Sequence, residues 1–200
     1  MSLEIDISKL NLNAGFLCFS THWQPNPNGP GQKIIMYSYI PLRSTDICLC
    51  GSGKNYSACC QTKRYWHPVC LNPGMKSYSL LVPQSATFSP VDGDKLQRQL
   101  MTDKRLHCSE DRRERSFWNF WGFPPVEDQY GILCFGDIEL RENRTLLVTA
   151  MSDLRMDISL NILKEITGNS LGKPKIAYDK ILLIDKLTNR SKFLKKRKRK

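Results

Sequence analysis

The sequence predicts an α+β protein in which a small cysteine-rich knuckle is attached to a compact domain that ends in a β-β-α-β unit, followed by a basic tail. Three observations predict this class. The 200 residues are 40% hydrophobic and 10% aromatic, which suffices for one domain with a substantial core. Five of the eight cysteines fall between positions 48 and 70. Strand-like and helix-like patterns alternate over residues 130–186.

Residues 1–43 are expected to contain a β-hairpin. The segments 14–23 and 33–40 are rich in β-branched and aromatic side chains, which favour strands. The linker between them, QPNPNGPGQ, is dense in Pro, Asn and Gly and indicates a reversal of the chain. Because this linker is longer than a tight two-residue turn, the register of the hairpin stays open.

Residues 71–186 are expected to form the α+β domain, which begins with helices over residues 94–121. Leu96 and Leu100 place two apolar side chains on one helical face. Ser109 is a candidate cap for a second helix whose first turn is acidic. A glycine followed closely by two prolines would end that helix.

An aromatic cluster follows the charged run EDRRER within the expected second helix. In a helix, Phe117 and Trp121 would face the core together, and Trp118 would lie off that face. Aromatic side chains beside arginine can also stack on unpaired bases or anchor a partner protein. A place in the core is the expected role. The members are Phe117, Trp118, Phe120, Trp121 and Phe123.

Residues 130–186 carry the clearest pattern and predict the β-β-α-β unit. Two strand-like segments, YGILCFGDIEL and RTLLVTAM, are joined by a polar turn. Ser152 or Asp153 then caps a helix with apolar residues at i+3 and i+4 spacings, and Gly168 is suited to its C-terminus. A final strand is expected over residues 175–185.

The last residues, 187–200, are expected to be a disordered basic tail. From Arg190 onward the chain has eight basic residues and no acidic one, so this end accounts for +8 of the formal +11. Such a block repels itself and cannot bury apolar surface. It suits a polyanion, most simply nucleic acid or the ribosome, while a nuclear address, an anionic membrane surface or a purely solubilising role stay open. The candidate nucleic-acid contacts are Lys192, Lys195, Lys196, Arg197, Lys198, Arg199 and Lys200.

Four cysteines stand in the segment CLCGSGKNYSACC, within the knuckle expected over residues 44–70. Four thiolates within thirteen residues suffice for a closed tetrahedral zinc site, and soft sulfur donors favour Zn²⁺ over Mg²⁺ and Ca²⁺. Gly51 and Gly53 permit the positive φ values that turn the chain back after the first pair. From spacing alone, a reduced thiol cluster and a redox disulfide pair remain alternatives. The four are Cys48, Cys50, Cys59 and Cys60.

The segment resembles the SEC-C motif, a small zinc-binding module named for the carboxyl terminus of a preprotein-translocation ATPase. That family's pattern is C-x-C-G-S-G-K-x-Y, then C followed by C or H. Departures from its usual residues do not touch a ligand position; they are Leu49, Asn55 and Gln61. The positions that match besides the cysteines are Gly51, Ser52, Gly53, Lys54 and Tyr56.

The resemblance implies a structural Zn²⁺ site whose ligands are Cys48, Cys50, Cys59 and Cys60. In that family the module is usually an appendage that docks on partner proteins or ribosome-associated material and has no reaction of its own. The protein is therefore expected to be a non-enzymatic zinc-containing adaptor with no catalytic residue. Its knuckle is expected to expose Lys54, Asn55 and Tyr56 for docking, with Lys54 also offsetting the charge of the four thiolates.

A second group of histidine and cysteine residues leaves an enzyme as the alternative function. His67 and Cys70 have H-x₂-C spacing, and His107 and Cys108 are adjacent. If the two pairs converge, they could hold a second metal ion, or a cysteine could act as a nucleophile beside a histidine base. Burial of these side chains in the core is the expected outcome, since free cysteine is usually buried.

Composition and hydropathy exclude some classes and favour one location. No apolar run reaches the length that a bilayer span needs, and the first residues lack the basic and apolar regions of a secretory signal. A cytoplasmic location is expected, where thiols stay reduced. A small-molecule substrate is not expected, because no catalytic constellation is convincing.

Overall fold

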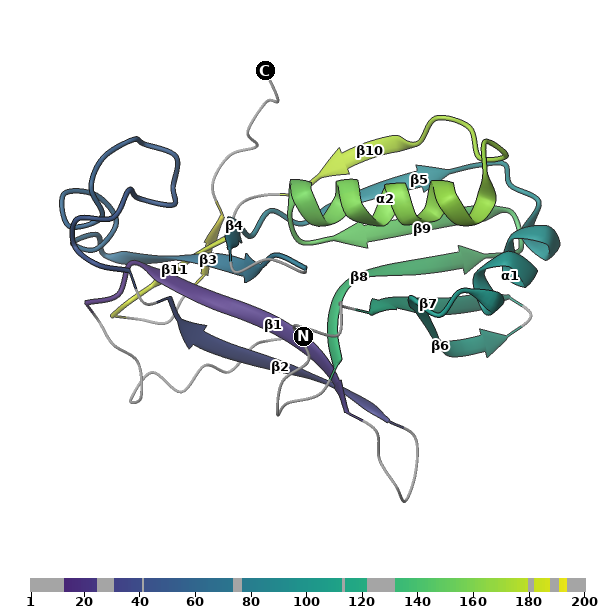
Figure 1. Cartoon of the computed structure of the whole chain (residues 1–200), viewed down its shortest axis with the longest axis horizontal. Coiled ribbons are helices and arrows are strands. Elements are labelled where there is room, and N and C mark those ends of the chain that lie inside the picture. Colours follow the sequence, from purple (N-terminus) through teal and green to yellow (C-terminus); the bar gives the residue numbers. More distant parts are fainter. Residues whose placement is uncertain are drawn as a thin grey trace.

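The computed structural model describes residues 13–24, 31–40, 42–73, 77–112, 114–121, 132–179, 182–187 and 191–193. Within these ranges the chain forms twelve strands, all connected in one sheet, and two helices. The cysteine-rich loop lies at one end of the molecule and the helices lie at the other (Figure 1). The helices are α1 (Gly93–Thr102) and α2 (Asp153–Thr167). The strands are β1 (Phe16–Gln24), β2 (Gln32–Tyr39), β3 (Tyr65–Leu71), β4 (Tyr78–Leu80), β5 (Gln84–Phe88), β6 (Leu106–Arg112), β7 (Arg115–Trp121), β8 (Ile132–Arg141), β9 (Thr145–Ala150), β10 (Lys175–Tyr178), β11 (Leu182–Asp185) and β12 (Ser191–Phe193).

Strand β1 connects the two ends of the sheet. Along one edge it pairs with β2 in an antiparallel hairpin, from Leu17 opposite Tyr39 to Gln24 opposite Gln32. Along its other edge, the first half of β1 pairs with β3 in parallel and the second half pairs with β8 in antiparallel. Strands β1 and β2 thus form a hairpin within the region expected to contain one, and both belong to the same sheet as the other described strands.

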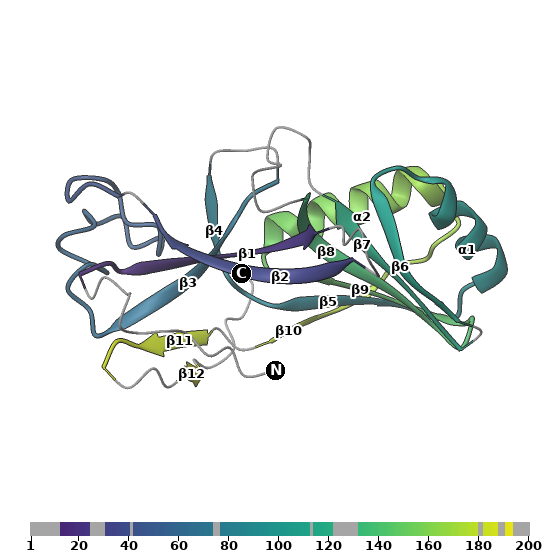
Figure 2. The same ribbon diagram turned by 90° about the horizontal axis from the view of Figure 1, so that it is seen from below.

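The larger core lies where α2 covers one face of β5, β8 and β9, with α1 against β6 and α2 (Figure 2). Helix α2 contributes Met156, Ile162 and Leu163, which are buried against the sheet. The Ser152 hydroxyl accepts a hydrogen bond of 3.2 Å from the Arg155 amide and caps the helix N-terminus. Gly168, with φ 63°, ends the helix. Strands β8 and β9 and then α2 follow one another along the chain in the region where the β-β-α-β unit was expected.

The helical prediction for residues 94–121 is correct only for its first part. Helix α1 is present and Asp92 caps it, but β6 and β7 form an antiparallel hairpin where a second helix from Ser109 was expected. Along β7 the side chains of Trp118 and Phe120 are fully buried, whereas Phe117 and Trp121 are only partly buried. This alternation follows the two-residue period of a strand and the strand preference of aromatic residues. The core role expected for the cluster therefore holds for Trp118, which was expected to lie off the core face, and for Phe120.

The strand expected over residues 175–185 is two strands in different parts of the sheet. Strand β10 pairs with β5 at the helical end, and β11 pairs with β3 close to the cysteine-rich loop. Two residues of β11, Ile184 and Asp185, pair with Trp66 and Tyr65. Residues 175–185 therefore contribute one strand to each of two parts of the sheet.

The expectation of a fully disordered tail over residues 187–200 is wrong at its start. Residues 191–193 form β12, which pairs in antiparallel with β11. Pairing with β11 gives this short segment the backbone hydrogen bonds that a count of charges cannot anticipate. Lys192 lies on β12, and the other predicted nucleic-acid contacts, Lys195–Lys200, lie outside the described residues.

Neither described helix could span a bilayer, because α2, the longer one, has 15 residues and a bilayer span needs roughly 20.

Candidate metal centre

The cysteine-rich loop runs between β2 and β3 and is shaped by its own backbone hydrogen bonds. Ile47 and Asn55 form an isolated β-bridge, and the Cys48 amide donates a hydrogen bond of 2.8 Å to the Lys54 carbonyl. Between them, Gly51 and Gly53 have φ values of 77° and 72°, in the left-handed region that favours glycine. The predicted reversal after the first cysteine pair is confirmed.

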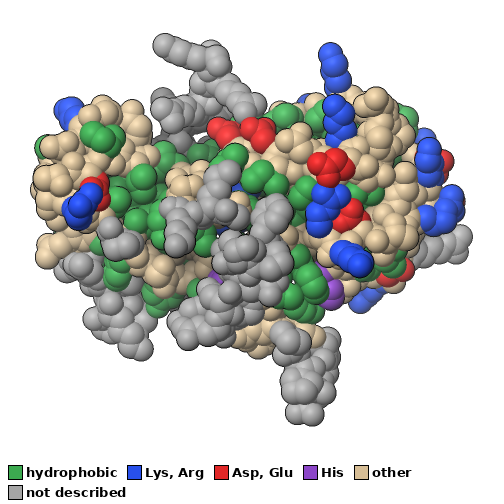
Figure 3. Space-filling model, in the orientation of Figure 1, with side chains coloured by type: hydrophobic (Ala, Val, Ile, Leu, Met, Phe, Trp, Pro, Cys, Tyr) green, Lys and Arg blue, Asp and Glu red, His purple; other side chains and the backbone are tan. Residues whose placement is uncertain are grey.

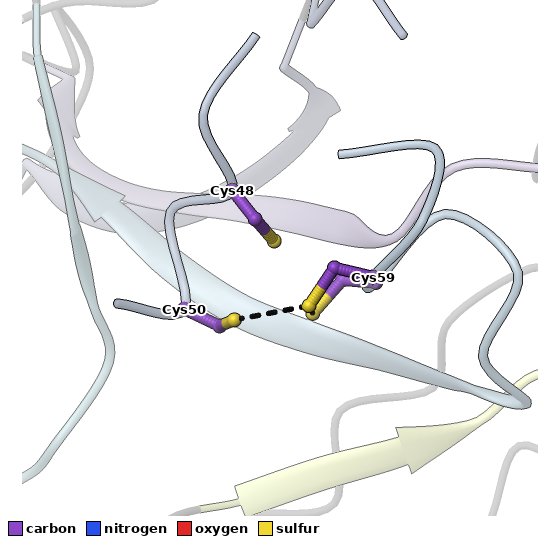
Figure 4. Close-up of side chains that lie close together, drawn as sticks. Cys48, Cys50 and Cys59 are labelled. Carbon is purple, nitrogen blue, oxygen red and sulfur yellow. Dashed lines mark hydrogen bonds between the residues drawn. The ribbon is translucent and has the colours of Figure 1, made fainter. Parts of the chain in front are cut away.

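The second cysteine pair lies on a tight turn that follows Tyr56. The amides of Cys59 and Gln61 donate hydrogen bonds of 3.0 and 3.3 Å to the Tyr56 carbonyl. This turn allows two adjacent cysteines to direct their side chains to the same place. Figure 4 shows that the side chains of Cys48, Cys50 and Cys59 point toward one another from the two turns of the loop.

The four sulfur atoms form one compact cluster. All lie within 4.8 Å of one another, with 3.4 Å between Cys50 Sγ and Cys59 Sγ and 3.8 Å between Cys59 Sγ and Cys60 Sγ. These separations are too long for a disulfide, whose sulfurs lie ~2.05 Å apart. A tetrahedral zinc site with Zn–S distances of ~2.3 Å places its sulfurs ~3.8 Å apart. Cys48, Cys59 and Cys60 are also buried, so the donor set and its spacing fit a tetrathiolate metal ion.

The pKa values of the thiols diverge within this cluster. Burial tends to raise the pKa of Cys50, but hydrogen bonds from Ser52 and Cys59 outweigh it and lower that pKa to about 6. Burial raises the pKa of Cys48 above its ordinary value. Burial, together with hydrogen bonds to Cys48 and Cys50, strongly raises the pKa of Cys60. Four sulfurs this close cannot all be negative without a cation among them.

Polar groups surround the sulfurs, and one of them was not predicted. The Ser52 hydroxyl lies 3.2 Å from Cys59 Sγ, as the G-S-G sequence allows. The Lys63 ammonium lies 3.8 Å from Cys60 Sγ and 4.0 Å from Cys59 Sγ. Lys54, which was expected to offset the thiolate charge, is exposed. The position of Lys63 one helical turn after Cys60 is the signal in the sequence that could have identified it.

The loop is packed on the start of β1 and is not a separate appendage. Tyr56 is only 5% exposed, and its hydroxyl accepts a hydrogen bond of 2.5 Å from the Gly15 amide. Its ring lies 5.8 Å from the ring of Phe16. The expectation that Tyr56 is exposed for docking is therefore wrong, because its aromatic ring supplies much of the small core under the loop. That core contains Phe16, Cys18, Ile40, Cys48, Tyr56, Cys59, Cys60 and Val69.

The second group of histidine and cysteine residues does not converge. His67 and Cys70 lie on β3, and the His67 ring packs 5.7 Å from Phe16. His107 and Cys108 lie on β6, where the His107 ring packs against two tryptophans, 4.4 Å from Trp23 and 4.8 Å from Trp121. Among the described residues, only the four-cysteine cluster brings three or more potential metal ligands together.

Comparison with known proteins agrees with the local geometry. A family model of the SEC-C motif matches residues 45–62, so the resemblance predicted from the sequence is confirmed for this segment. No curated protein matches the chain, and no solved structure matches it.

Proposed function

We propose that the protein is a zinc-containing adaptor or accessory protein without catalytic activity, and that Cys48, Cys50, Cys59 and Cys60 are the ligands of one structural zinc ion. The observation that carries this proposal is the cluster of four sulfur atoms within 4.8 Å of one another, inside a segment that matches the SEC-C motif. Thiolate ligands in tetrahedral spacing are typical of structural zinc.

A structural role follows from the donor set. Four protein thiolates fill the tetrahedral coordination of zinc, so a water or substrate molecule has no open position at the ion. When bound, the ion would supply charge neutralisation and cross-linking of the two turns of the loop. Tyr56 and Cys60 would then be held against Gly15 at the start of β1. On the side that faces the sheet, the sulfur cluster is covered by the core under the loop, which includes Phe16 and Val69.

The outer side of the loop is the candidate docking surface for a protein partner. Ser52, Lys54 and Asn55 are exposed on it, and Ile47 is 62% exposed. In place of the buried Tyr56, Ile47 supplies the apolar contact in this proposal.

Nucleic acid or the ribosome is the second proposed partner, through the basic tail. On the face in Figure 3, acidic and basic side chains are interspersed over the end that carries the helices. In the part of the chain that the structure describes, Arg115 and Arg141 both form ion pairs with Glu139. The excess positive charge of the sequence is concentrated after Arg190. A dense cationic block binds polyanions mainly by releasing counterions.

The test of the zinc site is metal content measured by mass spectrometry on the full chain purified under reducing conditions. We expect a single zinc ion per chain, which is lost in the Cys59→Ser variant. Cys108→Ser, a change at a cysteine outside the cluster, is the matched control and should keep the ion. A wild-type chain without metal, or full zinc content in Cys59→Ser, would overturn the proposal.

A further inference from the structure

Two lysine side chains from distant parts of the chain reach the turn that carries Cys59 and Cys60. Lys63 belongs to the cysteine-rich loop, and its ammonium lies within 4.0 Å of the sulfurs of Cys59 and Cys60. Lys186 follows β11, and its ammonium donates a hydrogen bond of 3.3 Å to the carbonyl of Gln61, the residue directly after Cys60. Positive charge therefore reaches this turn from two separate segments.

The burial of Lys186 calls for an anion. The residue is 6% exposed, and within the part of the chain that the structure describes it makes no ion pair with a carboxylate. The neighbouring Asp185 carboxylate instead accepts hydrogen bonds from Arg64 Nε (2.6 Å) and from the Leu187 amide (2.9 Å). The Gln61 carbonyl is neutral and cannot balance the ammonium charge. A buried ammonium is costly unless negative charge lies close to it.

The hydrogen bond to Gln61 holds the Lys186 ammonium beside the residue that follows Cys60, so the sulfur cluster is the candidate for this negative charge. Burial lowers the pKa of Lys186, and a negative charge on Cys60 opposes this by favouring the ammonium form. The charges also balance. Four thiolates around a divalent cation carry a net charge of −2, and the two ammonium groups carry +2. The backbone holds Lys186 in place, since its amide donates a hydrogen bond of 3.0 Å to the Arg64 carbonyl.

We infer that Lys63 and Lys186 are the counter-ions of the metal–thiolate centre, and that Lys186 makes the C-terminal segment part of that centre. This inference rests on the proposed zinc site. Without metal, four sulfurs this close cannot all stay negative, so less negative charge remains to balance the buried Lys186 ammonium. Lys186 therefore stabilises the zinc-bound protein and destabilises the metal-free protein.

The first measurement is zinc affinity, determined on the full chain by competition with a chromophoric chelator. Lys63→Met and Lys186→Met should each weaken zinc binding by about 10-fold or more, as loss of groups that support metal ligands typically does. Lys54→Met is the matched control, because Lys54 lies exposed on the same loop. Its zinc affinity should stay within about twofold of that of the wild type.

The second measurement separates a counter-ion from a lysine that only supports the fold. Lys186→Met should lower the melting temperature of the zinc-loaded protein and leave it unchanged or raised in excess chelator. A drop of equal size in both conditions would mean that Lys186 is structural and would overturn the assignment. If Lys186→Met does not fold, Lys186→Arg replaces it and should keep the wild-type zinc affinity because it keeps the charge.

Failure of the inference can be told from failure of the zinc site. If the wild type binds zinc and both methionine variants bind it equally tightly, the lysines are not counter-ions and the zinc site stands. If the wild type takes up no zinc, both proposals fall.

Discussion

The Gly15 amide donates a hydrogen bond of 2.5 Å to the Tyr56 hydroxyl, and this contact joins β1 to the middle of the cysteine-rich loop. Both groups are buried. Replacing Tyr56 by Phe would leave the Gly15 amide buried without a partner. We expect Tyr56→Phe to lower the free energy of unfolding by about 1–3 kcal/mol, the usual cost of an unsatisfied buried donor. Urea denaturation measures this loss. Tyr37→Phe, a change at a partly buried tyrosine of β2, is the control and should cost less than about 0.5 kcal/mol.

Gly15 also tests how closely the loop packs on β1. A Cβ atom at this position would lie 2.5 Å from the Cys60 carbonyl oxygen and 2.9 Å from the Tyr56 ring. We expect Gly15→Ala to push Cys60 outward, to destabilise the fold by about 1–3 kcal/mol and to weaken zinc binding. Gly172→Ala is the control, because a Cβ atom there meets nothing within 4 Å. Equal zinc affinity in the two alanine variants would contradict the proposed packing.

Metal removal should loosen one end of the molecule and leave the other intact. The core under the loop and the core under α2 are separate clusters of buried residues. We expect a chelator to speed amide hydrogen exchange in residues 44–64, at the start of β1 and in β11, while exchange in α2 keeps its rate. Faster exchange throughout the chain would mean that the metal holds the whole fold together.

Protonation of His107 should destabilise the protein in acid. Burial, with Trp23 and Trp121 packed against the ring, lowers the pKa of His107 below its ordinary value of 6.5. The unfolded chain therefore binds this proton more readily than the folded chain does. The contribution of His107 to stability is complete above pH 6.5 and is lost as the pH falls through the lower pKa of the folded state. Urea denaturation at pH 7.5 and pH 5.5 should show a smaller difference for His107→Phe than for the wild type. An unchanged difference would exclude His107 as the source.

The basic tail should govern the salt dependence of RNA binding. Deleting residues 194–200 removes six basic side chains and keeps β12. Each lost phosphate contact should reduce the slope of log K against log salt by ~0.7 for single-stranded RNA. Binding to nonspecific RNA across a salt series measures the slope. Serine at the six basic positions is the length-matched control and should behave like the deletion. The same slope in the full chain and in both variants would remove the tail as the contact.

The parts of the fold that the sequence predicts well are those set by neighbouring residues. Strands β8 and β9, the Ser152 cap and the Gly168 terminus all depend on local patterns of hydrophobicity and turn residues. The β6–β7 hairpin was missed because the acidic residues after Ser109 fit the first turn of a helix. The alternation of Trp118 and Phe120 with less buried neighbours becomes clear only once the sheet is known.

The candidate site divides in the same way. Its four cysteines lie within thirteen residues and carry a recognisable motif, so they could be predicted. Long-range pairing of β1, β3 and β11 brings Gly15, Arg64 and Lys186 close to the loop. No local sequence pattern predicts such pairing. The burial of Tyr56 was missed for the same reason.

The path of the cysteine-rich loop affects how the protein unfolds. The chain leaves β2 on one edge of β1, passes the start of β1 at Gly15, and enters β3 on the other edge. Strand β1 can separate from the sheet only after the contact between the loop and Gly15 opens. Because β1 also joins the two ends of the sheet, the opening of this loop contact is a step toward complete unfolding. A metal ion that holds the loop in this position should therefore slow unfolding and lengthen the lifetime of the native state.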